Sequence, residues 1–387
     1  MQNFQLNLPT KIIFGKDTEA LAGKEAAAYG KRVLLHYGGE SAKKYGVYDK
    51  VVSSLKENGL EIFELGGVMP NPRLTTVYEG IEIVRKNDID FILAVGGGSV
   101  IDSAKAISVG APYNGDVWDF YDYKATPEKS IPIGTVLTIA AAGSESSNSS
   151  VISNTQKELK RGLTSELLYP KFSILNPENT YTLPFNKFNC GACDILAHLM
   201  ERYFVNERHV DVTDRLIEGV CRSLIENSKK VFTNPRDYNI RAEIMLAGCF
   251  AHNGILDVGR GGDWASHGIE HELSAIYDIP HGAGLSIIFP AWMKKVSQTN
   301  PIKIIQFGKR VFDLYGSSSK ILGDTIEALE DFFLEMDLPI RLIKLLITEK
   351  HFETMARKAI EAGGGDTIGS YVKLNYDDVL EIYRLAR

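Results

Sequence analysis

Two segments in the second half of the chain gather side chains that can bind a metal ion. The first places Asp194 and His198 four residues apart, and the second contains His267, His271 and His281, so half of the eight histidines lie in these two stretches. Residues four apart share one face of a helix, so Asp194 and His198 can hold one ion between them. Carboxylate oxygen and imidazole nitrogen suit a divalent ion such as Fe²⁺ or Zn²⁺, and three or four such ligands leave a position open for substrate. The pattern therefore favours a catalytic metal over a structural one.

Spacing leaves two questions about these residues open. Asp194 and His198 could also form a plain buried hydrogen-bonded pair. His267 and His271 lie one helical turn apart, so spacing alone does not say which of them joins His281 at the ion. The other four histidines stand alone, and we expect them to be structural or surface groups: His36, His209, His252 and His351.

Length and composition place the chain among globular proteins that act on small molecules. Its 387 residues exceed a typical single core, so two domains are expected. With 43 basic and 49 acidic residues the net charge is -6, which argues against a nucleic-acid surface and against binding to anionic lipid. No apolar run is long enough to cross a bilayer, and the first residues lack the layout of a signal peptide, so we expect a cytoplasmic protein.

The four cysteines do not predict a disulfide framework in so long a chain. The pair Cys190 and Cys193 could be a redox motif or half of a zinc site, but no second C-x-x-C completes a four-sulfur site. We therefore expect ordinary buried thiols at all four positions: Cys190, Cys193, Cys221 and Cys249.

The pattern of elements changes near residues 176–184. Before it, short apolar runs alternate with helical stretches and meet glycines, which predicts βαβ units and a parallel sheet with ligands at the carboxyl edge. The expected strands are residues 31–37, 60–65, 90–95, 131–139 and 172–175. After it, amphipathic helical periodicity dominates, so we expect an α/β dinucleotide-binding domain over residues 1–180 and a helical metal- and substrate-binding domain over 181–387.

A glycine-rich turn lies where the third expected strand meets a helix. Gly96, Gly97 and Gly98 allow a pyrophosphate to approach the backbone, and the N-H groups and dipole of the following helix attract its charge. The turn departs from G-x-G-x-x-G because Ile101 takes the third glycine position. A plainer alternative is a tight turn with Ser99 as N-cap and Asp102 closing a capping box, and both can hold at once.

A second turn rich in serine follows the next strand and ends in Gly143-Ser144-Glu145-Ser146-Ser147. If it lies at the same sheet edge, Thr138, Ser144 and Ser147 supply hydroxyl groups to the cofactor. The alternative is simple solvation of a loop.

Together these segments resemble the iron-containing (group III) alcohol dehydrogenases, most of all the branch of NADPH-dependent butanol dehydrogenases and broad-specificity aldehyde reductases. The resemblance spans nearly the whole chain and rests on its opening, its turns and its histidine segments: 7–15, 70–72, 96–102, 143–146, 194–198, 267–271 and 280–282. It implies a Rossmann-like parallel-sheet domain followed by a helical domain, the dehydroquinate synthase-like fold.

The resemblance also implies roles for individual residues. The family's metal ligands fall on Asp194, His198, His267 and His281, while His271 falls beside the metal as a proton relay or orienting group. The residues implied to bind the cofactor lie in the turns and near them: Gly38, Gly39, Ser41, Asn71, Gly96, Gly97, Gly98, Ser99, Asp102, Thr138, Ser144, Ser147 and Lys160.

Cofactor preference is expected to follow the end of the first strand. Relatives that prefer NAD carry an aspartate there, which binds the ribose hydroxyl and repels a phosphate. This chain has Gly38-Gly39-Glu40-Ser41 instead, and although Glu40 opposes a phosphate, we favour NADP(H) over NAD(H).

The sequence thus predicts hydride transfer between NADP(H) and a small primary alcohol or aldehyde of the butanol and butanal type, with Fe²⁺ or Zn²⁺ as Lewis acid. The alternatives are an NAD-dependent polyol dehydrogenase or a dehydroquinate synthase-like lyase on the same fold, or a non-enzymatic metal- or nucleotide-binding protein. The apolar, strand-like opening, residues 4–14, offers an edge to a second subunit, so we expect a homodimer.

Overall fold

The computed structural model describes residues 1–39 and 41–387. They form two compact units, each described by itself below. The sheet unit comprises Asn7–Leu183 and Arg236–Asn253, and the helical unit comprises Met1–Leu6, Pro184–Pro235 and Gly254–Arg387. Within the described residues, no helix combines the length and the apolar character needed to cross a bilayer.

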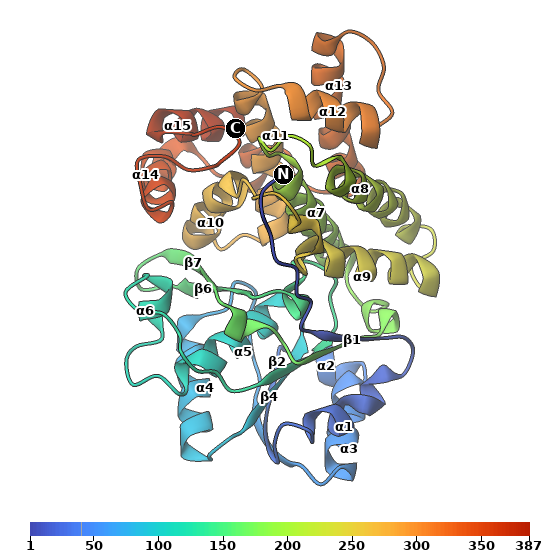
Figure 1. Ribbon diagram of the computed structural model, residues 1–387, viewed down its shortest axis with the longest axis vertical. Helices are drawn as coiled ribbons and strands as arrows, with labels where there is room; N and C mark the ends of the chain where they lie inside the picture. The colour runs from blue at the N-terminus through green and yellow to red at the C-terminus, as the bar shows by residue number, and fades with distance from the viewer. Residues whose placement is uncertain (40) are drawn as a thin grey trace. The chain divides into compact units, whose positions relative to one another are not determined.

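The sheet unit contains a six-stranded, wholly parallel sheet in the order β1-β8-β5-β4-β2-β3 (Figure 1). A two-stranded antiparallel hairpin, β6-β7, accompanies it. The strands are β1 (Lys11–Phe14), β2 (Arg32–Tyr37), β3 (Glu61–Leu65), β4 (Phe91–Gly96), β5 (Ile133–Leu137), β6 (Ser149–Asn154), β7 (Leu159–Thr164) and β8 (Phe172–Leu175). Its helices are α1 (Ala22–Ala26), α2 (Ser41–Lys44), α3 (Val47–Glu57), α4 (Leu74–Lys86), α5 (Gly98–Gly110), α6 (Trp118–Tyr121) and α9 (Tyr238–His252).

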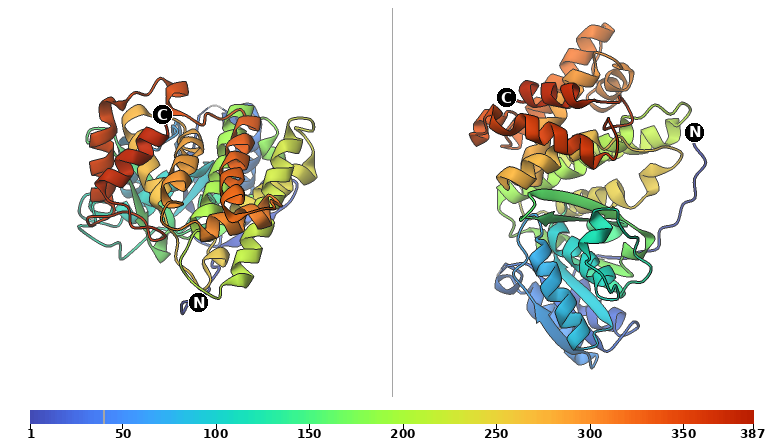
Figure 2. Two further views of the ribbon diagram at one scale, coloured as in Figure 1. Left: turned by 90° about the horizontal axis from the view of Figure 1, so that it is seen from above. Right: turned by 90° about the vertical axis from the view of Figure 1, so that its left-hand side faces the viewer.

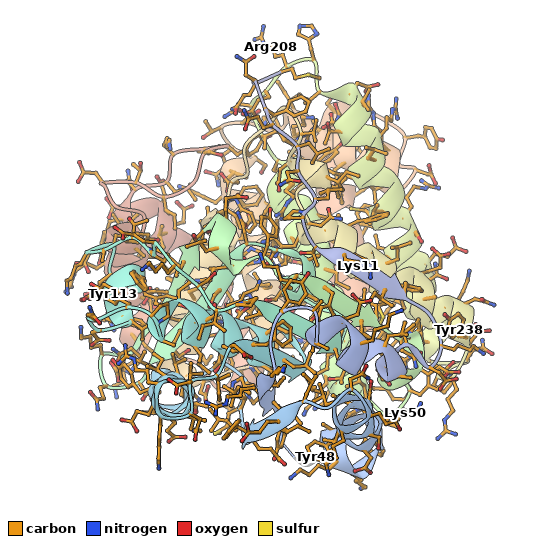
Figure 3. All side chains as sticks on the ribbon, turned by 60° about the horizontal axis from the view of Figure 1, so that its bottom comes forward. Lys11, Tyr48, Lys50, Tyr113, Arg208 and Tyr238 are labelled. Atoms are coloured by element: carbon orange, nitrogen blue, oxygen red, sulfur yellow. The ribbon has the colours of Figure 1, made fainter. Side chains whose placement is uncertain are left out.

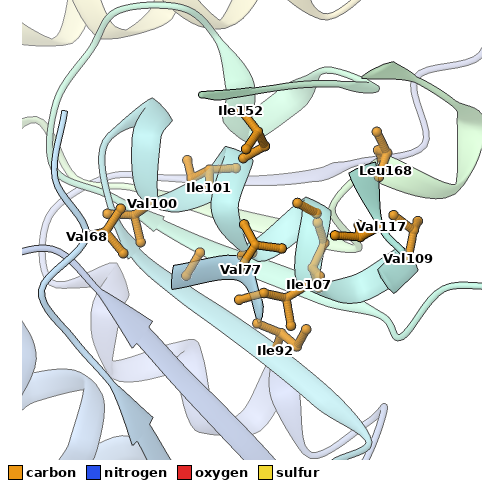
Figure 4. Close-up of a cluster of buried hydrophobic side chains, with 14 of the residues drawn as sticks. Val68, Val77, Ile92, Val100, Ile101, Ile107, Val109, Val117, Ile152 and Leu168 are labelled. Carbon is orange, nitrogen blue, oxygen red and sulfur yellow. The ribbon is translucent and has the colours of Figure 1, made fainter. Parts of the chain in front are cut away.

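Helices cover both faces of this sheet because successive strand residues alternate between two apolar clusters. One cluster joins Ile92 of β4 to Val77 of α4 and Ile107 of α5 (Figure 4). The other joins Val33 and Leu35 of β2 to residues of α1 and α3 on the opposite face (Figure 2). The central strands are buried along almost their whole length, as the near-continuous apolar runs in the sequence require.

Strands β2 and β4 are neighbours at the centre of the sheet, and the chain leaves them in opposite directions, β2 toward β3 and β4 toward β5. Such a topological switch point leaves a crevice at the carboxyl ends of the two strands, where nucleotides bind in open α/β sheets. The turns after β2 and β4 both belong to the predicted cofactor site.

The helical unit is built from long helices, with α11 packed against both α7 and α10. It has eight α-helices in the described residues: α7 (Phe185–Tyr203), α8 (Asp211–Val231), α10 (Ala265–Tyr277), α11 (His281–Val296), α12 (Ile302–Val311), α13 (Ser318–Glu335), α14 (Phe352–Ala362) and α15 (Tyr376–Leu385). The presence of a parallel-sheet unit and a helical unit in one chain confirms the predicted fold class.

The structural units differ from the predicted division at residues 180 and 181 in two places: Met1–Leu6 belong to the helical unit, and one long helix belongs to the sheet unit. α9 belongs to the sheet unit, because Met245 and Cys249 join the apolar cluster under β4 and α5. Its end also holds a loop of that unit, since the His252 Nδ1 lies 2.6 Å from the carbonyl oxygen of Ala142. Helical periodicity identifies α9 as a helix but carries no information about which core buries it.

The opening of the chain is less strand-like than its apolar alternation predicts. Only Lys11–Phe14 form a strand, while residues 1–10 form none. Met1 and Gln2 instead bond to the carbonyl oxygens of Arg208 and Gly259 in the helical unit, and Pro9 has no N-H to donate to a ladder. β1 still ends the described sheet with exposed side chains, Lys11 among them (Figure 3).

Candidate metal and cofactor sites

The helical unit gathers the predicted metal ligands from three helices. Asp194 and His198 lie one turn apart on α7 and are only 6% and 5% exposed. His267 comes from the first turn of α10, and His281 is the first residue of α11. One carboxylate oxygen, Asp194 Oδ1, is the hub: it lies 3.5 Å from Nε2 of His198 and 3.9 Å from Nε2 of both His267 and His281.

These distances fit a single ion between Asp194, His267 and His281, with His198 beside Asp194. In a tetrahedral site with bonds of about 2.1 Å, neighbouring ligand atoms lie about 3.4 Å apart. Ligand atoms of Asp194, His267 and His281 all lie within 4.8 Å of one another. Within the described chain no hydrogen bond reaches the buried Nε2 of His267, which is expected of a nitrogen whose partner is a cation. The donor set and its spacing therefore fit a divalent metal.

Two buried glutamates that the sequence analysis missed stand behind the imidazoles. The Glu201 Oε1 lies 2.8 Å from the Nδ1 of His267, and Glu270 contacts the Nδ1 of His281. Both glutamates are fully buried. Spacing offered a signal, because Asp194, His198 and Glu201 follow the i, i+4, i+7 pattern of one helix face.

His271 lies beside the cluster, as the resemblance implies. Its ring centre is 5.5 Å from that of His281, and the side chain is half-buried. Atoms of Glu270, His271 and His281 form a second close group, within 4.8 Å of one another. The structure thus brings together all five residues of the predicted metal and relay set, and it leaves the role of His271 a prediction.

The start of α10 has an unusual backbone conformation. Trp264 precedes the helix with a φ of 63°, in the left-handed region that residues other than glycine rarely adopt. Its indole ring lies against the rings of His198 and His267, with centre separations of 5.7 and 5.4 Å, and under the guanidinium of Arg202. The residue thus forms one wall beside two predicted ligands.

In the sheet unit, the glycine turn forms the junction between β4 and α5. Gly97 is the N-cap of α5, and no side chain of the described residues caps this helix. The alternative with Ser99 as N-cap and Asp102 closing a capping box is therefore wrong, because the helix begins earlier, at Gly98. A Cβ on Gly96 would lie 2.4 Å from Val100, so the tight turn itself requires glycine. Its open first N-H groups suit a phosphate.

The serine turn packs against α5 through a buried lysine. Lys105, fully buried on α5, donates to the carbonyl oxygens of Ser144 (2.7 Å), Ser147 (2.8 Å) and Ser149 (2.9 Å). Burial lowers the pKa of Lys105 to about 8. The Ser144 hydroxyl donates to Asp102 (2.5 Å), so both of these predicted cofactor residues have partners inside the protein. Lys105 and Asp102 fix the shape of the turn.

The remaining predicted cofactor residues lie on separate parts of the sheet unit. Thr138 follows β5, and its N-H donates to the carbonyl oxygen of Gly96 (3.0 Å), so these two turns are adjacent. Asn71 is buried with a φ of 53°, and Lys160 is buried on β7. Gly38 and Gly39 directly follow β2. Glu40 and the side chain of Ser41 lie outside the described residues.

The cysteines are free thiols, three of them buried and Cys190 partly exposed. Burial raises the pKa of Cys190 to about 11, so this thiol is not activated as a nucleophile. No disulfide is formed by any of the four.

Comparison with known proteins covers both units. Residues 9–177 match the family model described as iron-containing alcohol dehydrogenase, and residues 189–387 match the C-terminal model of the Fe-containing alcohol dehydrogenase family. A Bacillus subtilis (strain 168) protein named probable NADH-dependent butanol dehydrogenase 1 is 43% identical over 100% of both chains. The NADPH-dependent aldehyde reductase YqhD of Escherichia coli (strain K12) is 36% identical over 100% of both.

The fold also matches that of a solved structure. The crystal structure of NADH-dependent butanol dehydrogenase A from Thermotoga maritima matches with a TM-score of 0.96 at 40% identity, covering 100% of this chain and 99% of that one. The resemblance recognised in the sequence motifs is confirmed over the full length. With a parallel-sheet unit, a carboxylate and histidine cluster and two matching family models, this chain belongs to the iron-containing alcohol dehydrogenase family.

Proposed function

We propose that the protein transfers a hydride between NADP(H) and a small primary alcohol or aldehyde of the butanol and butanal type. The observation that carries the proposal is the hub at Asp194, whose Oδ1 lies within 3.9 Å of three imidazole nitrogens. Family membership and the names of the B. subtilis and E. coli relatives support the reaction class.

In this proposal the metal ligands are Asp194, His198, His267 and His281. A divalent ion held there, Fe²⁺ or Zn²⁺, would supply Lewis acidity to the oxygen of the aldehyde or alcohol. The Asp194 carboxylate offsets part of the ion's charge, while the neutral imidazoles supply nitrogen lone pairs. Trp264 shields two of these ligands from water on one side.

His271 has the proposed role of moving the proton. It neighbours His281 and is half-buried, so it can exchange protons with solvent while staying close to the ligand set. An imidazole is suited to this task because its ordinary pKa lies near neutral pH.

The cofactor is proposed to lie along the carboxyl edge of the sheet. Its pyrophosphate would meet the N-H groups of Gly97, Gly98 and Ser99 at the start of α5, where the helix dipole favours negative charge. The set extends to the turns after β2 and β5, to the serine turn and to two single residues: Gly38, Gly39, Ser41, Asn71, Gly96, Asp102, Thr138, Ser144, Ser147 and Lys160.

For the ribose 2′ position we keep NADP(H) as the favoured cofactor. The turn after β2 begins with Gly38 and Gly39 and holds no aspartate, although the carboxylate of Glu40 opposes a phosphate. One relative is named for NADH and another for NADPH, so only a direct comparison of the two cofactors decides the preference.

A homodimer remains part of the proposal. The outer edge of β1 carries Ile12 and Phe14, exposed by 37% and 38%, and could pair with the same strand of a second subunit. Sedimentation velocity tests this point, and a monomer at micromolar concentration would remove it.

The experiment for the reaction is a spectrophotometric scan at 340 nm with butanal and either NADPH or NADH. We expect oxidation of both cofactors to depend on butanal, with the higher kcat/KM for NADPH. A higher value for NADH would overturn the cofactor preference alone. No oxidation with any aldehyde, in protein shown to contain metal, would overturn the reaction and favour a binding protein.

A further inference from the structure

The Glu201 carboxylate is an unusual acceptor, because it joins α7 to the start of α10. It accepts hydrogen bonds from the main-chain N-H of Trp264 (2.6 Å), the main-chain N-H of His267 (3.1 Å) and the Nδ1 of His267 (2.8 Å). The side chain is fully buried and lies on α7 about one helical turn beyond His198, on the same face of the helix. It therefore contacts a predicted ligand without belonging to the ligand set.

These contacts decide which nitrogen of His267 carries the proton. An ionised carboxylate can only accept, so the Nδ1 of His267 must be the donor. In a neutral imidazole the other nitrogen then keeps its lone pair. That nitrogen, Nε2, is the buried atom on the side of Asp194. Glu201 thus selects the tautomer that can bind an ion.

The same carboxylate also caps the start of α10, because the N-cap residue of that helix provides no side-chain cap of its own. The N-cap of α10 is Trp264, and its side chain makes no capping hydrogen bond. Because a left-handed backbone is unfavourable for a bulky residue, this conformation of Trp264 needs support from outside the turn. Its N-H donates to Glu201, which ties the conformation of this turn to the orientation of His267.

Glu270 repeats the arrangement at His281. Glu270 is fully buried on α10, contacts the Nδ1 of His281 and accepts the hydroxyl of Ser274 (2.5 Å). Space for it comes from Gly284 on α11, where a Cβ would lie 2.4 Å from the Glu270 Oε1. Two of the three imidazoles therefore have a carboxylate behind Nδ1.

We infer that Glu201 and Glu270 are positioning residues that set the tautomers of His267 and His281 before any ion binds. The inference rests on the proposed metal site and adds to it two groups that never touch the ion. Second partners of this kind typically change metal affinity by about 10- to 100-fold.

The test uses the full-length chain and Zn²⁺ alone, with affinity measured by competition against a chromophoric chelator. Glu201→Gln and Glu270→Gln keep the size of the side chain but offer one acceptor oxygen in place of two. We expect each to raise the Zn²⁺ dissociation constant about 10- to 100-fold. Glu218→Gln is the matched control, because Glu218 is a buried glutamate of the same unit that bonds to Tyr203 and not to a predicted ligand.

A second measurement reads the tautomer in the wild type itself and uses a variant only to identify signals. The ¹⁵N spectrum of the metal-free wild type, with the His267 signals identified by their loss in His267→Ala, should show a protonated Nδ1 and an unprotonated Nε2. A protonated Nε2 in that spectrum, or equal loss of Zn²⁺ affinity in the glutamate variants and the control, would overturn the inference. Failure of the wild type to bind Zn²⁺ or Fe²⁺ would instead overturn the proposed metal site.

Discussion

Gly282 lies where two helices that carry predicted metal ligands, α11 and α7, come into close backbone contact. A Cβ built on it would lie 2.1 Å from the carbonyl oxygen of Cys190 and 2.6 Å from its carbonyl carbon, whereas ordinary Cβ contacts begin near 3.4 Å. Both groups are helical backbone, so no side chain can rotate away. Gly282→Ala must therefore move α11 from α7 by about 1 Å, at a cost of about 1–3 kcal/mol.

This shift acts on the metal site because His281 directly precedes Gly282, and Asp194 is one turn beyond Cys190. Metal sites tolerate about 0.2 Å in their bond lengths, far less than the expected movement. We predict a Zn²⁺ dissociation constant raised at least about tenfold and kcat/KM lowered on the order of 100-fold.

The assay pairs chelator competition with thermal unfolding, and Gly323→Ala is its control. Gly323 is a helical glycine of the same unit with nothing within 4 Å of an added Cβ. Alanine there should stabilise the helix by up to about 1 kcal/mol and leave the Zn²⁺ affinity unchanged. If Gly282→Ala bound Zn²⁺ as tightly as the control, the placement of α11 against α7 at the metal would be refuted.

Three further predictions concern single residues. His281→Ala should abolish stoichiometric metal binding. His271→Ala should keep the metal and lower kcat about 100-fold. Equal metal loss in both variants would contradict the assigned roles. Gly143→Ala places a Cβ 2.6 Å from the Gly248 carbonyl oxygen at a φ of 68°. The KM for reduced cofactor should therefore rise at least about fivefold with unchanged metal content. An unchanged KM would contradict a role of the serine turn in cofactor binding. Burial lowers the pKa of His36 from 6.5 to about 4. Between these pH values the unfolded state binds a proton that the folded state does not, so the free energy of unfolding decreases as the pH falls from 6.5 toward 4. Urea unfolding should show the wild type losing about 2 kcal/mol more than His36→Gln between pH 7 and pH 5, and equal losses would refute a neutral buried imidazole.

Much of the sheet unit could be predicted from local sequence because its central strands are buried on both faces. The apolar runs at 31–37, 60–65, 90–95 and 172–175 correspond to β2, β3, β4 and β8, each within a residue or two. The edge strand β1 was predicted only as part of a longer strand-like opening, residues 4–14. The hairpin β6-β7 gave no signal, because its residues are largely polar and hydrophobic periodicity does not mark them.

The candidate site was predictable in its residue types and less so in its arrangement. Spacing paired Asp194 with His198, but His267 and His271 have equivalent spacing on α10. They differ in their contacts with α7, a tertiary property: the Nε2 of His267 lies 3.9 Å from Asp194 Oδ1, and its Nδ1 lies 2.8 Å from Glu201 Oε1. Glu201 and Glu270 went unnoticed for a similar reason, since a glutamate in a helix usually faces solvent and only packing reveals that it is buried.

The central claim is that the reaction requires an ion at the Asp194 hub. Its most direct test is the rate of NADPH oxidation by butanal at 340 nm, measured on the protein as purified, after verified removal of metal, and after addition of Fe²⁺ or Zn²⁺. The account predicts that activity disappears with the metal and returns with one equivalent of ion per chain. Full activity in protein shown to be free of metal would contradict it.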